Sequence, residues 1–281
     1  MSEERVLPSL PQTTIRPYHG RVPVGWRDLW AFRDLLYFLT WRDVKVRYKQ
    51  TALGAAWAVL QPFLTMVVFS VFFGALAKIP SGDVPYPVFV YTALVPWAFF
   101  ANAVTQASNS LVEQEAILTK VYFPRLIVPT AAVLAGLVDV SIAFVVLVGM
   151  LFFYGIVPTA AVLTLPFFVL FAAVTALAVS LWLSALNVRY RDVRYTLPFI
   201  VQIWLFVSPV AYPSSLVPEP WRLLYGLNPM AGVVDGFRWA LLGDVEAPGW
   251  ALLVSVVTVL LLLVGGLRHF RRMERSFADA I

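Results

Sequence analysis

The sequence predicts an all-α protein that crosses a membrane several times. Of its 281 residues, 60% are hydrophobic and 13% are charged, and the mean hydropathy is +0.79, a balance typical of polytopic membrane proteins. The stretch from Ala52 to Ala77 carries no charge, and about 20 apolar helical residues suffice to cross the hydrocarbon core of a bilayer. Basic residues just before such a stretch mark the cytoplasmic side, and four of them lie here: Arg42, Lys45, Arg47 and Lys49.

The N-terminal quarter of the chain divides into two parts before the first span. Residues 1–25 are polar, contain four prolines and lack the apolar segment of a signal peptide, so we expect a largely irregular cytoplasmic tail. Residues 26–50 have helical periodicity, with three tryptophans near one side and a favourable spacing of Asp43 and Arg47. This pattern predicts an amphipathic helix in the headgroup layer, which either only anchors the chain or also gathers an anionic lipid headgroup.

Residues 51–270 are predicted to form the transmembrane domain. Its six spans are expected at about residues 57–77, 88–106, 126–154, 160–186, 196–212 and 249–267. Between the fifth and sixth spans, Trp221–Leu227 and Pro229–Leu242 have the pattern of two short helices, with Asn228 as an N-cap. Since these apolar runs are too short to cross, we expect an extracytoplasmic re-entrant hairpin. Residues 271–281 form a basic cytoplasmic tail.

Positive charges support six spans with both termini in the cytoplasm. Eighteen of the 21 Lys and Arg residues fall in segments 1–56, 107–126, 187–196 and 267–281. The alternate segments hold only Lys78, Arg222 and Arg238. This distribution follows the positive-inside rule, which also explains the net charge of +5 better than binding of nucleic acid does.

Motifs for catalysis are absent from the sequence. There is no GxxxxGK[ST] phosphate-binding loop, no cysteine, and the two histidines, His19 and His269, lie in opposite tails. We therefore predict no metal site and no enzymatic activity. A membrane-bound transferase acting on polyprenyl lipids would need acids or histidines clustered at one membrane face. The one ionisable residue placed deep in a span is Asp139, which either bonds to a neighbouring helix, the interpretation we favour, or takes part directly in transport.

Two cytoplasmic loops and two aromatic spans each admit two interpretations. Glu113–Arg125 and Asn187–Tyr195 are either ordinary positive-inside anchors or a docking surface for a cytoplasmic protein, since Arg and Tyr often carry binding energy. The aromatic side chains of the first and fifth spans contact lipid and pack helices, or else stack against sugar rings beside Gln61, Gln202 and Ser208.

Four segments, in the right order and spacing, resemble one known family. They are WRDVKVRYKQTALGAAWAVLQP, LVPWAFF followed by EAILTKVYFPRLIVP, LNVRYRDVRYTLPFIVQIWLFVSPVAYP, and NPMAGVVDGFRWALLG. The chain resembles the transmembrane subunit of ABC-2-type polysaccharide exporters, which move lipid-linked O-antigen, capsule and teichoic acid chains. The resemblance covers roughly residues 30–270.

This resemblance implies a homodimer in the bacterial inner membrane that encloses one channel. Two copies of a separate cytoplasmic ATPase would bind ATP and Mg, while this chain would bind no cofactor. The substrate would be a polyprenyl-pyrophosphate-linked glycan, exported by ATP-driven alternation. The alternative with the same fold is an exporter of a smaller lipid or a drug.

The resemblance also implies roles for particular residues. Contact with the ATPase would involve Glu113, Glu115, Lys120, Tyr122, Arg125, Arg189, Tyr190, Arg191, Asp192 and Arg194. The lipid headgroup would be bound by Trp26, Arg27, Trp30, Arg33, Arg42, Lys45 and Arg47. The channel would be lined by Gln61, Phe69, Phe73, Phe199, Gln202, Trp204, Phe206 and Tyr212. The outer gate would include Trp221, Asn228, Pro229 and Arg238.

Overall fold

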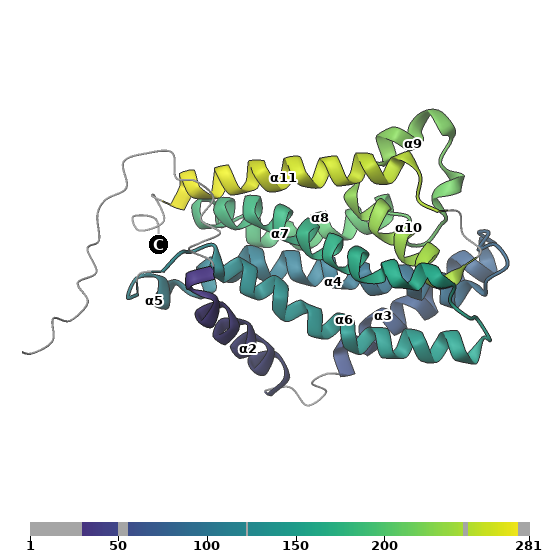
Figure 1. Ribbon diagram of the computed structural model, residues 1–281, viewed down its shortest axis with the longest axis horizontal. Coiled ribbons are helices and arrows are strands. Elements are labelled where there is room, and N and C mark those ends of the chain that lie inside the picture. Colours follow the sequence, from purple (N-terminus) through teal and green to yellow (C-terminus); the bar gives the residue numbers. More distant parts are fainter. Residues whose placement is uncertain (1–29, 50–55, 122, 244–246, 275–281) are drawn as a thin grey trace, which may run out of the picture.

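The computed structural model describes residues 30–49, 56–121, 123–243 and 247–274, and every regular element within these ranges is a helix (Figure 1). Five helical stretches are long and apolar enough to cross a membrane. They are α3 (Ala56–Phe69) with its π-helical continuation η1 (Ser70–Leu76), α4 (Tyr86–Glu113), α6 (Ile127–Phe153), η2 (Ala160–Thr164) with α7 (Leu165–Arg189), and α11 (Trp250–Glu274). The expected all-helical, multi-pass fold is thus confirmed.

The expected fifth span is shorter than the sequence suggested. Helix α8 runs over Val193–Val207, whereas we expected residues 196–212. Its C-cap Ser208 is already extended, and Pro209 follows, so the helix ends there. Fifteen residues rise about 22 Å, less than the roughly 30 Å of the hydrocarbon core. Length and composition alone therefore give five candidate spans and one shorter apolar helix.

Helix α4 is the centre of the bundle. It packs against α6, α7 and α10 (Pro229–Leu242), and 78% of its most apolar window is buried, against 17% for the α3–η1 stretch and for α11. Because a helix that is apolar on all sides needs an apolar environment on all sides, the exposed flanks of α3 and α11 require lipid or another chain.

Two of the long helices extend beyond their expected ends. Helix α4 continues through the Asn- and Ser-containing stretch to Glu113, because buried contacts with α6 and α7 accommodate its polar side chains. Helix α11 continues through the basic stretch to Glu274. His269 consequently lies in a helix rather than in a tail, stacked on Trp182 with 4.9 Å between the ring centroids.

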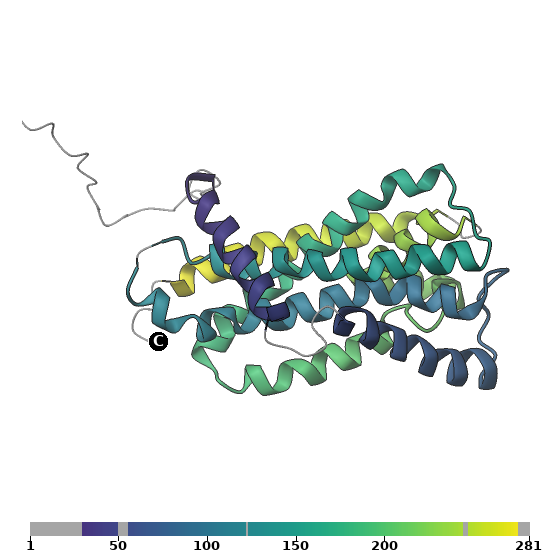
Figure 2. The ribbon, with the colours of Figure 1, turned by 90° about the horizontal axis from the view of Figure 1, so that it is seen from below.

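Helix α2 (Arg33–Lys49) crosses the bundle obliquely and lies against α6 (Figures 1 and 2). It buries Leu39 and Val44, while Tyr37, Phe38 and Trp41 are exposed. Trp41 belongs to the side of the helix on which the sequence places the tryptophans, and the bundle does not cover it. The exposed aromatic side chains of α2 therefore face away from the bundle.

Beyond α8 the chain forms short helices, two of which lie at the positions expected for the hairpin, and we call these two the hairpin. The short helices η3 (Ser214–Leu216) and α9 (Glu219–Tyr225) precede α10, most of which is buried. Asn228 caps α10 as the sequence predicted, since its side chain accepts a hydrogen bond of 3.1 Å from the amide of Met230. Helices α9 and α10 both begin and end within two residues of the bounds that we expected for the two short helices.

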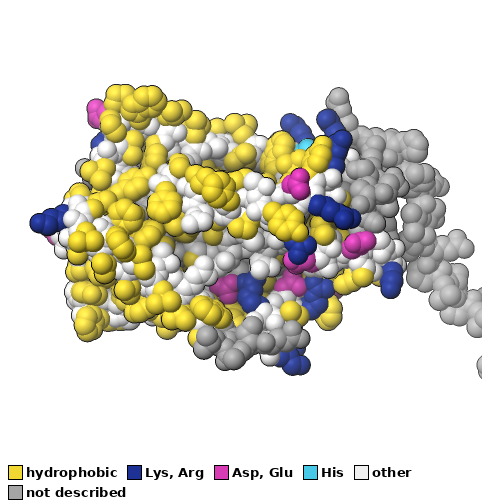
Figure 3. All heavy atoms as spheres, turned by 180° about the vertical axis from the view of Figure 1, so that it is seen from behind, with side chains coloured by type: hydrophobic (Ala, Val, Ile, Leu, Met, Phe, Trp, Pro, Cys, Tyr) yellow, Lys and Arg dark blue, Asp and Glu magenta, His cyan; other side chains and the backbone are white. Residues whose placement is uncertain are grey.

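A second hydrophobic cluster, separate from the main core, joins six helices at one end of the molecule. It contains Leu39 of α2, Leu111 of α4, Leu118 of the one-turn helix α5 (Glu115–Leu118), Ile127 of α6, Leu181 of α7 and Phe270 of α11. On the face shown in Figure 3, most charged side chains gather toward this same end, and hydrophobic side chains cover the remainder. The charged end of the molecule is thus also a packed junction of helices.

Candidate functional site

A cavity of about 520 Å³ opens between α2 and the turn that joins α4 to α5. Its size suits a small-molecule group or a lipid headgroup. We call it the α2 cavity. It is lined by Arg42, Asp43, Val46, Arg47, Gln106, Glu113, Gln114, Ala116, Ile117 and Ala132.

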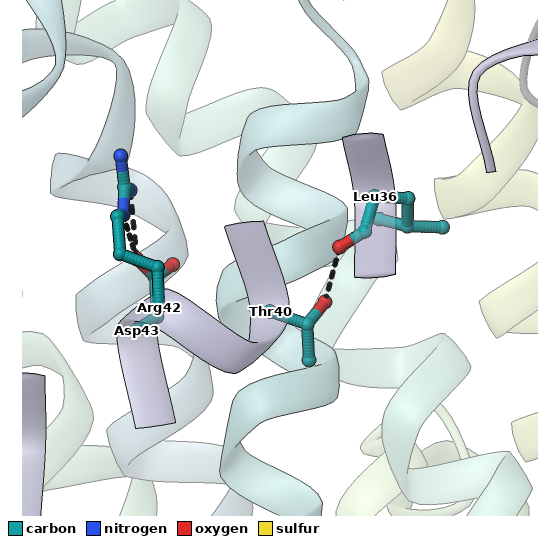
Figure 4. Close-up of polar contacts among 4 residues, drawn as sticks. All are labelled: Leu36, Thr40, Arg42 and Asp43. Carbon is teal, nitrogen blue, oxygen red and sulfur yellow. Dashed lines mark hydrogen bonds and ion pairs between the residues drawn. The ribbon is translucent and has the colours of Figure 1, made fainter. Parts of the chain in front are cut away.

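Two arginines of α2 face the α2 cavity, and each is paired with a carboxylate. Arg42 donates from Nε and Nη2 to Oδ1 of the neighbouring Asp43, at 3.1 and 2.7 Å (Figure 4). Figure 4 also shows that the hydroxyl of Thr40, on the same helix, donates to the main-chain carbonyl of Leu36. The expected pairing of Asp43 with Arg47 is therefore replaced by one between adjacent residues, because Arg47 has a partner elsewhere.

The partner of Arg47 is Asp139, in the middle of α6. Arg47 donates to one carboxylate oxygen, and the hydroxyl of Tyr48 donates to the other. Burial, and after it the carboxylate of Asp139, raises the pKa of the Tyr48 phenol above its usual range, so the phenol keeps its proton at neutral pH. The bond that we expected between Asp139 and a neighbouring helix is present, and that helix is α2.

On its other side Asp139 lines a cavity of about 20 Å³, large enough for one water molecule. Gln61 and Trp57 of α3 and Asn102 of α4 line the same cavity. The carboxylate thus stands between the α2 cavity, reached through Arg47, and the face of α3 on which Gln61 lies.

The other residues expected to bind a headgroup do not gather at this cavity. Trp26 and Arg27 lie outside the described residues. Arg33 lies 5.5 Å from the ring centroid of the exposed Trp30, and Lys45 lies 5.4 Å from that of Trp41. Such cation–π pairs suit the headgroup layer of a membrane.

The two segments expected to contact an ATPase leave the bundle close together. Asn187, near the end of α7, donates to the carbonyl of Ser108 and to the side-chain oxygen of Asn109 in α4, at 3.0 and 2.9 Å. Asn187 is buried, and sequence reasoning missed it because nothing local distinguishes a buried asparagine near a helix end. Among the residues expected to contact the ATPase, those that are exposed are Glu113, Glu115, Lys120, Arg189, Tyr190, Arg191, Asp192 and Arg194.

One residue of the first segment is tied to another helix instead. The backbone amide of Arg125 donates to a side-chain oxygen of Glu274 at 3.2 Å, and its guanidinium donates to the carbonyl of Glu274 at 3.4 Å. The end of α11 therefore holds the chain where it turns into α6. Tyr122 lies outside the described side chains. The docking role of both segments stays a prediction.

The residues expected to line a channel lie on α3 and its continuation η1, on α8 and in the turn after α8 (Figure 2). Helices α3 and α8 approach one another at Phe69 and Phe206, whose ring centroids are 6.4 Å apart. Phe199 and Phe206 are exposed, as are Gln61 and Gln202, whereas Phe73 is half-buried and packs edge-on against the buried Phe69. This pair of helices presents a largely apolar, aromatic face with two amide side chains.

Trp204 and Tyr212 instead connect α8 and the turn that follows it to the hairpin. Trp204 donates from its indole nitrogen to the side-chain oxygen of Asn228 at 2.8 Å, and its ring packs edge-on against Phe100. The hydroxyls of Tyr212 and Tyr225 are 3.1 Å apart. Asn228 is therefore both the N-cap of α10 and the contact through which α8 holds the hairpin.

Arg238, expected at an outer gate, is fully buried in α10. Its guanidinium donates to the carbonyls of Pro209 and Val210 at 2.6 and 2.8 Å, and lies 3.6 Å from the ring centroid of Phe89. Further hydrogen bonds reach the carbonyls of Phe89 and Tyr212. Arg238 thus fixes the turn after α8 against α4. By contrast, Trp221 of the same hairpin is exposed, and Pro229 is buried at the first turn of α10.

Similarity to known proteins extends over most of the chain. Residues 34–242 match the family model described as ABC-2 type transporter. The O-antigen export system permease protein RfbA of Myxococcus xanthus is 30% identical over 91% of this chain and 98% of that protein. RfbA of Klebsiella pneumoniae is 28% identical, over 88% and 95%. The polysialic acid transport protein KpsM of Escherichia coli is 22% identical, over 84% and 92%.

Proposed function

Because the chain belongs to the ABC-2 type transporter family, we propose that it is the permease subunit of an ABC transporter that exports a lipid-linked polysaccharide of O-antigen, capsule or teichoic-acid type. One observation carries this proposal: the match to the O-antigen permease of Myxococcus xanthus covers 98% of that protein. A match of this extent includes α2, both expected ATPase contacts and the hairpin, and not only the apolar spans.

The proposal includes six spans, with both termini in the cytoplasm of a bacterial inner membrane. Helix α8 would be the additional span that makes six. Because the helix ends at Val207, the turn after it, which Arg238 holds, would form the remainder of the crossing. The charge distribution along the sequence supports this orientation. Helix α2 would lie in the cytoplasmic headgroup layer with its exposed aromatic side chains, and α9–α10 would form the re-entrant hairpin on the outer side.

The partners we propose are a second copy of this chain and two copies of a cytoplasmic ATPase that bind ATP and Mg. The sequence has no phosphate-binding loop of its own, which fits a division of labour between subunits. The aromatic face of α3 and α8 is the surface we assign to the channel between the two copies. There, ring faces would stack on sugars, and Gln61 and Gln202 would bond to hydroxyls.

Transport would proceed from the α2 cavity to this channel. Arg42 and Arg47 would attract the diphosphate of the substrate, since guanidinium groups pair well with phosphate oxygens. ATP hydrolysis would act through the exposed segments around Glu115 and Arg191. A movement of those segments would alternate access between the two sides and open the hairpin.

The test is to deplete the protein and to analyse polyprenyl-linked glycans on the cytoplasmic side of the membrane. We expect one such lipid to accumulate while the matching surface polymer disappears, and a plasmid copy of the wild-type chain to reverse both. Normal surface polymer without trapped lipid would contradict polysaccharide export. Export of a smaller lipid or a drug, the alternative with the same fold, would then be tested with the same partner ATPase.

A further inference from the structure

The pairing of Arg47 with Asp139 connects two parts of the molecule that have different tasks in the proposed transport. Arg47 belongs to the helix assigned to headgroup binding, and Asp139 to the middle of a candidate span. Their side chains are 26% and 14% exposed. A pair this enclosed is held more firmly than a surface salt bridge, and loss of one partner leaves the other uncompensated.

Each member of the ion pair lines a different cavity. Arg47 lines the α2 cavity but not the small one, and Asp139 lines the small cavity but not the α2 cavity. A group bound in the α2 cavity would therefore contact Arg47, and Asp139 lies behind that residue, beside Gln61 in the small cavity.

Phosphate and carboxylate compete for the same face of a guanidinium. Both accept two parallel hydrogen bonds from arginine, and a diphosphate carries more charge and more acceptor oxygens than a carboxylate. If Arg47 turned to a phosphate, Asp139 would keep the hydrogen bond from Tyr48 and would lie in the same small cavity as Asn102. The structure thus supplies a donor that lets Asp139 release Arg47 without being left unpaired.

Building on the proposed function, we propose that Asp139 is a positioning residue that occupies the phosphate-binding face of Arg47 in the empty transporter and yields it to the diphosphate of an incoming substrate. While it holds Arg47, it also holds the end of α2 against α6. Arrival of the substrate then frees that end of the helix. No covalent bond changes in this exchange, and one anion replaces another on the same cation.

Binding of inorganic pyrophosphate to the purified full-length protein in nanodiscs tests the exchange. Asp139→Asn removes the competing charge but keeps the size of the side chain, so pyrophosphate should bind about tenfold more tightly, the equivalent of one charged hydrogen bond. The matched control is Asp34→Asn, which removes the same charge from a 93% exposed side chain on α2 and should bind as the wild type does. Adding Arg47→Gln to Asp139→Asn should abolish the gain.

A purely structural role for Asp139 predicts the opposite sign, because loss of the contact would disorder α2 and weaken binding. Unchanged or weaker binding by Asp139→Asn, or no binding by any variant, would therefore overturn the proposal. If that variant does not fold, Tyr48→Phe takes its place. Tyr48 does not line the α2 cavity, yet its loss should weaken pyrophosphate binding several-fold, since Asp139 would then hold Arg47 alone, while the melting temperature should stay that of the wild type. Weaker binding together with a lower melting temperature would instead indicate a purely structural contact. Unchanged binding would contradict the exchange.

The source of the phosphate is tested in the same nanodiscs. A polyprenyl diphosphate should displace pyrophosphate, whereas the corresponding polyprenol, which lacks phosphate, should not. Failure of the diphosphate lipid to compete would overturn the link to the substrate. Export itself is measured separately, from the surface polymer of wild-type cells, so a failure of the exchange and a failure of the proposed function give different results.

Discussion

The side chain of Asn187 in α7 donates a 3.0 Å hydrogen bond to the main-chain carbonyl of Ser108 in α4. Both residues are buried. The contact joins the two helices just before each continues into a segment that we expect to meet the ATPase. The two expected contacts consequently start from helices that are joined at this point, and we expect them to move together.

Replacing Asn187 with Ala should therefore lower both stability and coupling. The carbonyl of Ser108 would lose a buried donor, which costs about 1 to 3 kcal/mol. We expect a lower melting temperature in tryptophan fluorescence and less substrate-stimulated ATP hydrolysis by the complex. Thr196→Ala, which removes an exposed hydroxyl of α8 that bonds within its own helix, is the control. Equal melting temperatures for the two variants would contradict a structural role for Asn187.

Reversing the charge of Arg189 and Arg191 should release the ATPase. Both side chains are exposed in the second segment, and opposed charges across an interface weaken it. We expect loss of copurification of the ATPase, with normal insertion of the permease. Arg222→Glu reverses an exposed cation of α9, in the hairpin, and should leave the complex intact. Copurification and ATP hydrolysis like those of the wild type would remove the docking role of Arg189 and Arg191.

Replacing Arg238 with Met should destabilise the turn between α8 and α9. The four carbonyls that accept hydrogen bonds from the guanidinium would lose their donor, and hydrogen bonds to a charged group contribute about 1.5 to 3 kcal/mol each. We expect a large drop in melting temperature and faster proteolysis near Tyr212. Arg238→Lys keeps the positive charge but lacks the planar guanidinium with its several donors, and should recover only part of the lost melting temperature. A melting temperature unchanged in both variants would show that the turn is held by other contacts.

Gly236 should not tolerate a side chain. A Cβ atom at this position would lie 2.0 Å from the ring of Phe168, so α10 and α7 touch at a distance that only glycine permits. Gly236→Ala should reduce the yield of folded protein, because a packed interior resists added volume. Phe168→Ala combined with Gly236→Ala should recover part of that yield. The close approach would be refuted if Gly236→Ala alone expressed and melted like the wild type.

Five of the apolar spans could be predicted from the sequence because an apolar run is a matter of local composition, while the sidedness stays a prediction. A run of apolar residues such as Ala52 to Ala77 indicates a span by itself, and clustered basic residues indicate its cytoplasmic side. The cap of α10 was also predictable, since Asn228 and Pro229 adjoin in the sequence.

Contacts between distant parts of the chain could not be predicted in this way. Arg47 and Asp139 are 92 residues apart, and no local pattern points from one to the other. The short length of α8 depends on Ser208 and Pro209, but the turn after it is held to the bundle by Arg238, which we expected only as a residue of the outer gate. The extension of α4 to Glu113 depends on burial of polar side chains between helices, which periodicity does not reveal.

The second hydrophobic cluster has a consequence for how force passes through the molecule. Leu118 of α5 and Leu39 of α2 belong to the same close-packed group, and such packing transmits displacement instead of absorbing it. A displacement of α5 by the proposed ATPase would therefore also displace α2. The stroke that powers export and the helix that collects the cargo would then move together, so that a single ATPase cycle could both load the substrate and drive it across.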